Sequence, residues 1–376
     1  MTAPLPLDAT GVITIDLSAL QANWQALARL VAPAECGAVV KADAYGLGAA
    51  EVIPALALAG CRTFFVATPE EGRAARLLAP DARLFVLDGL FPGAAPLLLA
   101  ADAAPVLSSL DEVEEWAREA ARVGRKLPAA LQVDTGLNRL GLSGSDVKVL
   151  ADSPELLAAL DLRLVISHRA CADDPSHPHN AKQRAAFNRR RALLPAVPAS
   201  LAASDGLMLG AAYRYDLVRP GYALYGGQAF QGGPTPVTPV VTVEARVLQV
   251  RTLKTGDSVG YSATWQTARP TRLAVVAAGY ADGIARALSA AAGKKGGVVM
   301  VTGQRAPIVG RVSMDLITVD VTDVKGEVAR GDLVTLVGPG LTLEAMGRAA
   351  GTIGYEVLTR LGPRFVRRYT GGGALP

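Results

Sequence analysis

The 376-residue sequence lacks the residue patterns that mark several common functional classes. Its three cysteines, Cys36, Cys61 and Cys171, lie far apart and show no CxxC spacing. Neither a disulfide framework nor a metal site is therefore expected. Charged residues are 19% of the chain, the net charge is +4, and no Lys/Arg block lies beside aromatic residues. Nucleic acid is therefore not an expected partner.

Targeting and membrane signals are also missing. Residues 1–11 contain no basic stretch followed by an apolar one, so no signal peptide is predicted. No uncharged apolar run reaches the roughly 18 residues that a membrane span requires. Together with unpaired cysteines, these absences favour a cytoplasmic protein without a membrane partner.

What the sequence does contain is a regular alternation of short apolar strands and helical segments. Half of the residues are hydrophobic, and the length favours two domains. Strands are predicted at 37–41, 63–67, 83–87, 104–107, 129–134, 162–167, 200–203 and 217–225, with helices such as 51–59, 69–78, 111–123 and 181–194 between them. Eight such repeats predict an α/β domain, a TIM-like (β/α)8 barrel. An open doubly wound sheet is the alternative, but no GxGxxG follows the first strand.

The pattern changes after residue 226. A Gly- and Pro-rich linker is followed by β-branched segments at 237–251, 272–278, 297–301, 317–321 and 333–337, and 343–350 alone has a helical pattern. We therefore predict a barrel domain at 1–236 and a mainly-β C-terminal domain at 237–376. A short strand at 13–17 precedes a helix capped by Ser18, and the first ~10 residues are candidates to pack on the second domain.

Chemically useful side chains follow the predicted barrel strands. The apolar run 38–40 ends in Lys41, and a lysine there is costly as a buried cation unless a partner or a reaction uses it. A neutral lysine amine can form a Schiff base with a carbonyl group. His168, Ser204 and Arg219 also follow strands, at the end where barrel active sites lie.

Eight motifs extend this pattern over more than 300 residues. They are AVVKADAYGLG (38–48), VDTGLNRLG (133–141), SHRACADDP (167–175), VRPGYALYG (218–226), GYSATW (260–265), GYADG (279–283), GRVSMD (310–315) and GYEVLTRLGP (354–363). In this order, the motifs resemble the alanine racemase family. The resemblance implies a barrel joined to a β domain, pyridoxal 5'-phosphate (PLP) as cofactor, and a homodimer with shared active sites.

The implied reaction is the interconversion of L- and D-alanine by two bases, which supplies D-alanine for peptidoglycan or degrades it. Lys41 would hold the cofactor covalently and act as one base. Tyr261 of the partner subunit would act as the other. A phenol titrates near 10, so it needs help to act as a base, and His168 is the candidate to provide it.

The remaining implied roles concern binding. Arg219 would face the pyridine nitrogen of the cofactor as a permanent donor. Arg139 would contact the cofactor or the substrate carboxylate. The phosphate-binding set would be Tyr45, Ser204, Gly221, Tyr222 and Tyr355. Met314 and Asp315 would face the substrate, and Asp173, Tyr280 and Arg311 would line the substrate-access corridor.

The sequence departs from the family pattern at four positions. Gln132 replaces a lysine that is often carbamylated, and we expect its amide oxygen to brace Arg139 instead. Ala203 and Gly354 replace asparagines. Ile284 replaces an aromatic residue, which predicts a wider or less polar corridor.

Three alternatives stay open. The first is a racemase of broader specificity acting, for example, on serine, for which Ile284 is the motive. The second is a decarboxylase of basic amino acids, but that enzyme should carry a catalytic cysteine in the second domain, and all three cysteines precede residue 172. The third is a non-catalytic PLP carrier, which would resemble the barrel alone.

Overall fold

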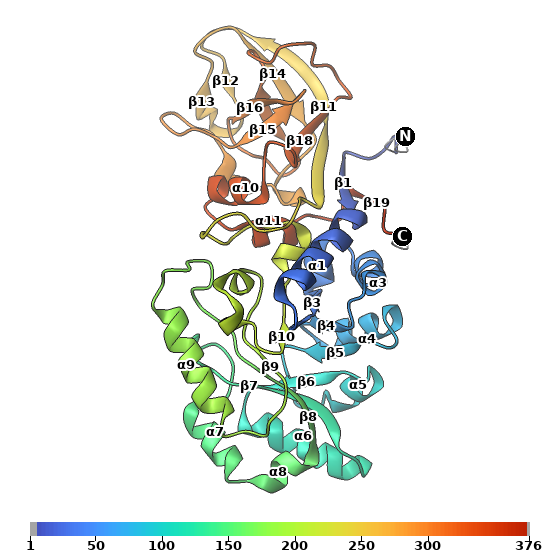
Figure 1. The fold of residues 1–376 in the computed structure, drawn as a ribbon. Coiled ribbons are helices and arrows are strands. Elements are labelled where there is room, and N and C mark those ends of the chain that lie inside the picture. The colour runs from blue at the N-terminus through green and yellow to red at the C-terminus, as the bar shows by residue number, and fades with distance from the viewer. Residues whose placement is uncertain (1–5, 374–376) are drawn as a thin grey trace. The chain divides into compact units, whose positions relative to one another are not determined.

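The structure is a computed structural model and describes residues 6–373 (Figure 1). The chain divides into two compact units. One contains Ala19–Thr238 together with the described residues beyond Gly371. The other contains the described residues up to Ser18 together with Pro239–Gly371. The first five residues of the segment expected to pack on the second domain lie outside the described residues. Within residues 6–373, no helix has the length and apolar character needed to cross a membrane.

The first unit is built around parallel strands whose side chains are almost all buried. Seven of them form one sheet in chain order: β3 (Ala38–Val39), β4 (Thr63–Val66), β5 (Arg83–Val86), β6 (Ala104–Leu107), β7 (Leu127–Gln132), β8 (Leu160–Ile166) and β9 (Ala199–Ser200). An eighth, β10 (Leu217–Val218), pairs in parallel with β2 (Glu35–Cys36). Burial on both faces is typical of parallel strands covered by helices.

Backbone hydrogen bonds close these strands into a ring. Arg219 N donates to Ala202 O (2.9 Å), which joins the β10 segment to the β9 segment. Gly37 N donates to Val218 O (3.0 Å), which joins the β10 segment to the first strand of the sheet. The predicted barrel is therefore confirmed.

Helices follow the strands, as the alternating pattern predicts. They are α1 (Leu17–Val31), α3 (Ala49–Ala59), α4 (Pro69–Leu78), α5 (Ala95–Ala100), α6 (Leu110–Val123), α7 (Gly144–Ala151), α8 (Pro154–Ala159) and α9 (His179–Arg191). The side chains of Thr68, Ser109 and Ser143 cap α4, α6 and α7 by accepting a backbone N–H of the first turn.

Two predicted strands end earlier than expected. The strand predicted at 37–41 stops at Val39, because the backbone turns into a left-handed conformation just after Lys41. The strand predicted at 217–225 stops at Val218. Pro220 has no N–H to donate to a ladder, and residues Tyr222–Tyr225 form a 3-10 turn instead.

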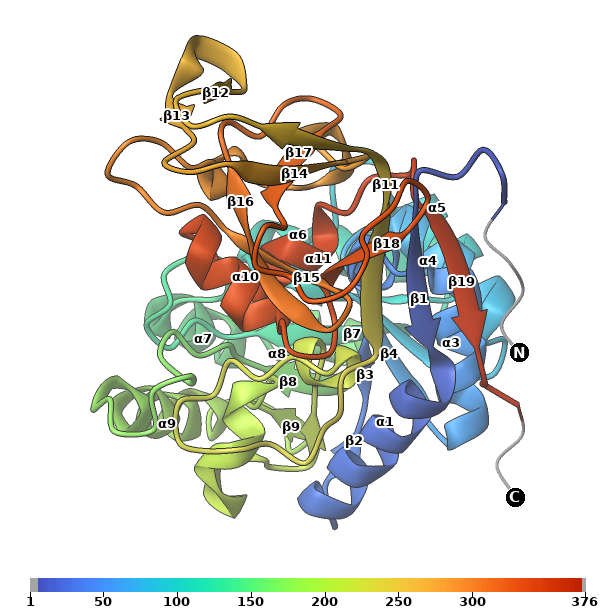
Figure 2. The same cartoon turned by 90° about the horizontal axis from the view of Figure 1, so that it is seen from above.

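The second unit is a mainly antiparallel sheet in the order β14-β17-β16-β15-β18-β11-β1-β19. Its strands are β1 (Gly11–Asp16), β11 (Val241–Leu253), β14 (Thr271–Val276), β15 (Val298–Val301), β16 (Gln304–Val309), β17 (Ile317–Asp320), β18 (Leu333–Val337) and β19 (Val366–Thr370). A two-stranded pair, β12 (Ser258–Val259) and β13 (Trp265–Gln266), stands apart from it. β11 also pairs with β14, so the sheet curves back on itself. Figure 2 shows β1 between β11 and β19.

Among the described residues beyond 238, the second unit contains two α-helices, whereas the sequence pattern predicted one. The predicted helix is α10 (Leu343–Ala350). The additional helix is α11 (Gly354–Thr359), which carries Tyr355. At six residues it is too short to show a periodic apolar pattern.

Candidate active site

Lys41 lies at the carboxyl end of β3, where the chain makes a left-handed turn. Residues 42 to 45 have φ between 52° and 60°, although none is glycine. This conformation costs roughly 1–2 kcal/mol per residue for L-amino acids. Glu71 supports the turn, because its carboxylate accepts Ala42 N (2.8 Å) and Ala67 N (2.7 Å). The carboxylate of Asp43 also stabilises the turn, because it accepts a hydrogen bond from Ala49 N (2.7 Å).

Three of the predicted phosphate-binding residues meet next to this turn. Tyr45 is 8% exposed, and a Cβ added to Gly221 would lie 2.2 Å from its Oη. Ser204 Oγ accepts Gly221 N and Ala223 N, both at 3.1 Å. Burial raises the pKa of Tyr45, and Asp205 adds to this effect, so the phenol remains a hydrogen-bond donor. Tyr222, which follows Gly221, is buried.

Arg219 is held in a fixed orientation at the end of β10. It is 4% exposed. Nη1 donates to Ser200 O (2.9 Å) and to Ser200 Oγ, and Nη2 donates to Ser167 O (2.7 Å). Among the described residues, no hydrogen bond uses Nε, so this donor is left for another group. Burial lowers the pKa of Arg219 to about 9, and Arg169 contributes, so the side chain is still a cation at neutral pH.

His168 follows β8 and is surrounded by cations. Burial lowers the pKa of His168 to about 3, and Arg219, Arg139 and Lys41 add to the shift. The imidazole is therefore neutral at physiological pH. Its backbone is held by Gln183 on α9, whose Nε2 donates to His168 O (3.1 Å).

Arg139 and Asp173 lie in loops that follow β7 and β8. Arg139 is exposed. The brace expected from Gln132 is not formed, because Gln132 Nε2 donates to Leu140 O (2.9 Å) and no bond joins it to Arg139 among the described residues. Asp173 is bonded to Gln231 of the linker, through Gln231 N to Asp173 O (2.8 Å) and Gln231 Nε2 to Asp173 Oδ2 (3.1 Å).

The second unit carries the other predicted residues in two groups of its own. Tyr261 begins a 3-10 turn and is 71% exposed, and Arg311 Nη1 donates to Ser262 Oγ (3.1 Å) beside it. In the second group, Tyr280 N donates to Ser313 O (3.0 Å). This bond holds the 279–283 turn against the loop that contains Met314 and Asp315.

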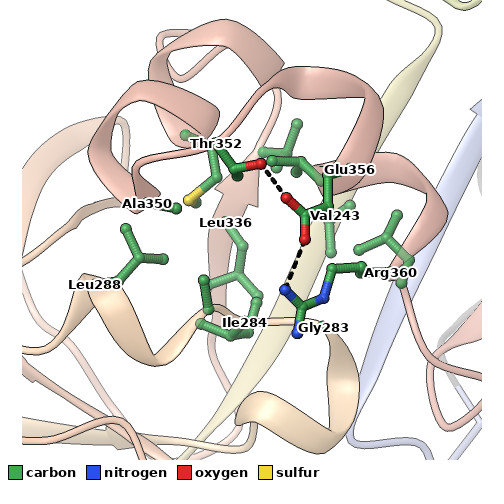
Figure 3. Close-up of a pocket in the computed structure, with 14 residues that line it drawn as sticks. Val243, Gly283, Ile284, Leu288, Leu336, Ala350, Thr352, Glu356 and Arg360 are labelled. Carbon is green, nitrogen blue, oxygen red and sulfur yellow. Dashed lines mark hydrogen bonds and ion pairs between the residues drawn. The ribbon is translucent and has the colours of Figure 1, made fainter.

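A pocket in the second unit is lined mainly by apolar side chains (Figure 3). Ile284 is one of them and is 6% exposed, so it belongs to the core of this unit. The effect of Ile284 on an access corridor stays a prediction. Across the pocket, Glu356 accepts hydrogen bonds from Thr352 and from Arg360 (2.9 Å), which stabilise the short helix α11 next to Tyr355.

Sequence reasoning missed several residues that support these groups. Glu71, Gln183 and Arg364 act through hydrogen bonds to distant segments, and no local pattern in the sequence indicates such contacts. Arg169 was also missed. It is 6% exposed, its three guanidinium nitrogens have no hydrogen-bond partner among the described residues, and a Cβ on Gly206 would lie 1.5 Å from its Nη2.

Known proteins resemble this chain along nearly its whole length. The N-terminal domain of alanine racemase matches residues 15–229, and the C-terminal domain of alanine racemase matches residues 240–369. The alanine racemase of Methylobacterium nodulans is 49% identical over 364 residues, covering 96% of this chain and 97% of that protein. A catabolic alanine racemase of Agrobacterium fabrum is 45% identical and covers 98% of this chain and 94% of that protein.

A solved structure shows the same fold. The alanine racemase of Bartonella henselae, crystallised with covalently bound pyridoxal phosphate, has a TM-score of 0.91 and 43% identity, and the match covers 96% of this chain and 100% of that one. The two matched regions together contain all eight motifs. The chain belongs to the alanine racemase family.

Proposed function

We propose that this protein interconverts L-alanine and D-alanine with PLP as its cofactor. The observation that carries the proposal is the grouping of Lys41, His168, Arg219 and the Tyr45–Gly221 contact at the carboxyl ends of the barrel strands, in a chain whose relatives are alanine racemases. Some matching relatives are named catabolic alanine racemases, and others are named alanine racemases without that word. Both the supply and the degradation of D-alanine are therefore compatible with the family.

The barrel residues fit an anionic, phosphate-bearing cofactor. Gly221 approaches Tyr45 so closely that no side chain fits, so its backbone passes directly beside the hydroxyls of Tyr45 and Ser204. The guanidinium of Arg169, which has no hydrogen bond among the described residues, lies against Gly206, two residues beyond Ser204, and 4.9 Å from the centre of the Tyr213 ring. A buried cation without hydrogen bonds is costly unless an anion compensates it. Tyr45, Ser204, Gly221, Tyr222 and Tyr355 would hold the phosphate.

Bound PLP withdraws electrons from Cα of an amino acid and thereby acidifies the α-proton. In the proposed mechanism Lys41 Nζ removes or returns that proton on one face of Cα. Tyr261 Oη does so on the other face. Nη1 and Nη2 of Arg219 are used by bonds within the protein, so its Nε would be the donor to the ring nitrogen of the cofactor.

His168 is proposed to assist Tyr261. Because the imidazole is neutral, one of its ring nitrogens is able to accept a hydrogen bond from a phenol. The cations near His168 also favour the ionised form of a phenol placed among them. Arg139 remains the proposed contact for the cofactor or the substrate carboxylate, without the brace predicted from Gln132.

We also propose that the active protein is a cytoplasmic homodimer that shares its active sites. Tyr261, Tyr280 and Met314 are 71%, 41% and 54% exposed in the single chain. Grouped exposed apolar side chains are typical of surfaces that another protein covers. A second copy of the chain would cover them and would receive Tyr261 next to its own Lys41. Arg311, Tyr280 and Asp173 would then line the access corridor.

The test combines cofactor binding with racemisation. The purified protein should bind PLP, show the visible absorption of a lysine-bound cofactor, and racemise both enantiomers of alanine. Lys41→Ala should abolish that absorption and reduce racemisation by about 10³-fold or more, because it removes both the attachment and a base. Lys182→Ala, an exposed lysine on α9, is the matched control and should change neither readout.

Two results would contradict the proposal. One is PLP-loaded wild-type protein that leaves the chirality of alanine unchanged. The other is Lys41→Ala protein that retains racemisation. Serine and lysine tested in the same assay determine substrate breadth.

A further inference from the structure

Gln183 is a fully buried glutamine on α9 that contacts the barrel where β7 and β8 end. Its side chain is 0% exposed. Nε2 donates to His168 O (3.1 Å) and to Thr135 Oγ1 (3.2 Å), and Oε1 accepts Ala170 N (2.9 Å). A carbonyl oxygen only accepts and a backbone N–H only donates, so the amide has a single orientation that satisfies all three bonds.

These bonds replace a strand ladder that is missing around His168. β8 ends at Ile166. Among the described residues, no backbone–backbone hydrogen bond involves residues 168–170. Buried peptide groups need partners, and the amide of Gln183 supplies one for His168 O and one for Ala170 N. One side chain therefore fixes the backbone on the carboxyl side of the imidazole.

A second series of bonds fixes the backbone on the amino side. Thr135, which accepts a bond from Gln183, lies with its Oγ1 2.8 Å from Ser167 Oγ. Ser167 directly precedes His168, and its carbonyl oxygen accepts Arg219 Nη2 (2.7 Å). Both hydroxyl residues are buried. Gln183 is thus connected through Thr135 and Ser167 to the arginine that is proposed to face the cofactor.

The imidazole of His168 lies among side chains of the proposed active site. Burial is the first cause of its low pKa, and Arg219, Arg139 and Lys41 add to the shift, which requires these cations to be near the ring. The direction in which a side chain leaves the chain is set by its backbone. Whatever fixes the backbone of residues 167–170 therefore also sets where the imidazole points.

We propose that Gln183 is a positioning residue, which orients His168 toward Tyr261 of the partner subunit by fixing the backbone on both sides of the imidazole. This inference rests on the proposed function, in which Tyr261 serves one face of Cα and Lys41 the other. The turn after Lys41 is held separately by Glu71. Loss of the Gln183 bonds should therefore slow proton transfer at Tyr261 and leave the transfer at Lys41 in place.

The test replaces Gln183 with methionine in the PLP-loaded holoenzyme. Methionine has a similar length but no amide, so the variant removes the three bonds and fills most of the same space. We expect kcat/KM per PLP-loaded site to fall by about 10- to 100-fold, because a catalytic group displaced by roughly 1 Å loses up to about that factor. Both enantiomers of alanine have the same free energy, so the loss should be equal in the two directions.

Alanine deuterated at Cα identifies which of the two bases is slowed. For the enantiomer from which Tyr261 removes the proton, a slower transfer makes breaking of the C–D bond limiting, so the isotope effect on kcat/KM should rise. For the other enantiomer, Lys41 removes the deuteron and the later return of a proton by Tyr261 becomes limiting, so the isotope effect should fall. A merely structural role of Gln183 would change neither isotope effect.

Hydrogen exchange gives a second readout that does not depend on turnover. In PLP-bound Gln183→Met, the Ala170 amide loses its acceptor and should exchange about 10-fold faster, as measured by mass spectrometry of peptides that contain Ala170. Gln21→Met is the matched control, since Gln21 is 1% exposed and donates Nε2 to Ala55 O (3.0 Å) in the same unit. It should alter neither the isotope effects nor the exchange at Ala170.

Should Gln183→Met fail to fold, Thr135→Val tests the same series of bonds. It removes the hydroxyl shared by Gln183 and Ser167, and the two isotope effects should again change in opposite directions, with a several-fold loss of kcat/KM.

Three results in a folded, PLP-loaded Gln183→Met protein would overturn the inference: wild-type kcat/KM, unchanged exchange at Ala170, or isotope effects that stay constant or change in the same direction. Where Thr135→Val takes its place, wild-type kcat/KM or the same behaviour of the isotope effects does so. Failure of wild-type protein to racemise alanine would instead overturn the proposed function, and the exchange at Ala170 would still test the bond to Gln183.

Discussion

At the residue scale, the protonation state of His168 depends on burial and on neighbouring cations. Its pKa of about 3 lies well below the value near 6.5 of an exposed histidine. Between these values the unfolded chain binds a proton that the folded chain does not. Stability must therefore fall as the pH decreases from about 6.5 towards 3, and His168 has no effect on the pH dependence above that window.

We predict that His168→Gln flattens this acid dependence in the cofactor-free protein. The wild-type free energy of unfolding should carry an additional slope of up to about 1.4 kcal/mol per pH unit below pH 6.5. Urea unfolding at pH 7.0, 6.0, 5.0 and 4.0 measures it, and those pH values cover most of the window. His177→Gln, at an exposed position, is the control and should keep the wild-type slope. Equal slopes in wild type and His168→Gln would show that the folded protein binds this proton.

At the element scale, the left-handed turn after Lys41 needs support from neighbouring segments. Four consecutive non-glycine residues at positive φ are unfavourable by themselves. Glu71, on α4, bonds one carboxylate oxygen to the turn and the other to the end of β4. The orientation of Lys41 thus depends on a helix that begins 28 residues later in the sequence, at Pro69.

Glu71→Ala should therefore weaken both the fold and cofactor retention. Loss of two hydrogen bonds to a charged acceptor predicts destabilisation of about 2 kcal/mol. It also predicts several-fold weaker PLP binding, because the turn that presents Lys41 is released. Thermal unfolding and equilibrium dialysis of PLP measure the two effects. Glu70→Ala is the adjacent control, since Glu70 makes an exposed ion pair with Arg73 and should have little effect. Wild-type PLP affinity in Glu71→Ala would contradict this account.

At the scale of the whole molecule, the proposed site needs residues from two chains. Lys41 and Tyr261 belong to different units, and Tyr261 is exposed on its own chain. If the sites are shared across a two-fold dimer, a mixed dimer of Lys41→Ala and Tyr261→Phe chains contains one site with both changes and one intact site.

Mixing the two inactive variants should therefore restore activity. With random exchange, half of the dimers are mixed and one of two sites in each is intact, which predicts about a quarter of wild-type activity. Co-expression with two different affinity tags isolates the mixed dimer, which should have about half of the wild-type activity in the racemisation assay. As a control, Lys41→Ala mixed with Arg219→Ala should restore nothing, because both changes lie in the barrel unit and each site receives one of them. No recovery in the first mixture would contradict shared sites.

The order of the elements was readable from local sequence, and the motifs supplied the residues of the proposed site. Alternating strands and helices predicted the barrel, and the β-branched segments predicted the second unit, because burial on one or both faces imposes a period on apolar residues. Motifs such as AVVKADAYGLG located Lys41 and Tyr45, because their spacing within one turn is short. The helix α11 was not predicted, because six residues are too few to show a helical period of apolar side chains. The ends of two strands were not predicted either, because the end of a strand depends on which residues of a distant neighbouring strand can pair with it.

Only the tertiary structure decided which residues support the site. Glu71, Gln183, Arg364 and Asp282 act on segments that are far away in sequence. The neutral state of His168 results first from burial and then from the arginines and the lysine that lie near it. It also placed Ile284 in the core and paired Gln132 with Leu140. The sequence by itself determined the family, the chemistry and the position of Lys41. The protonation states and orientations of the side chains in the proposed site depend on burial and long-range contacts, which exist only after the chain has folded.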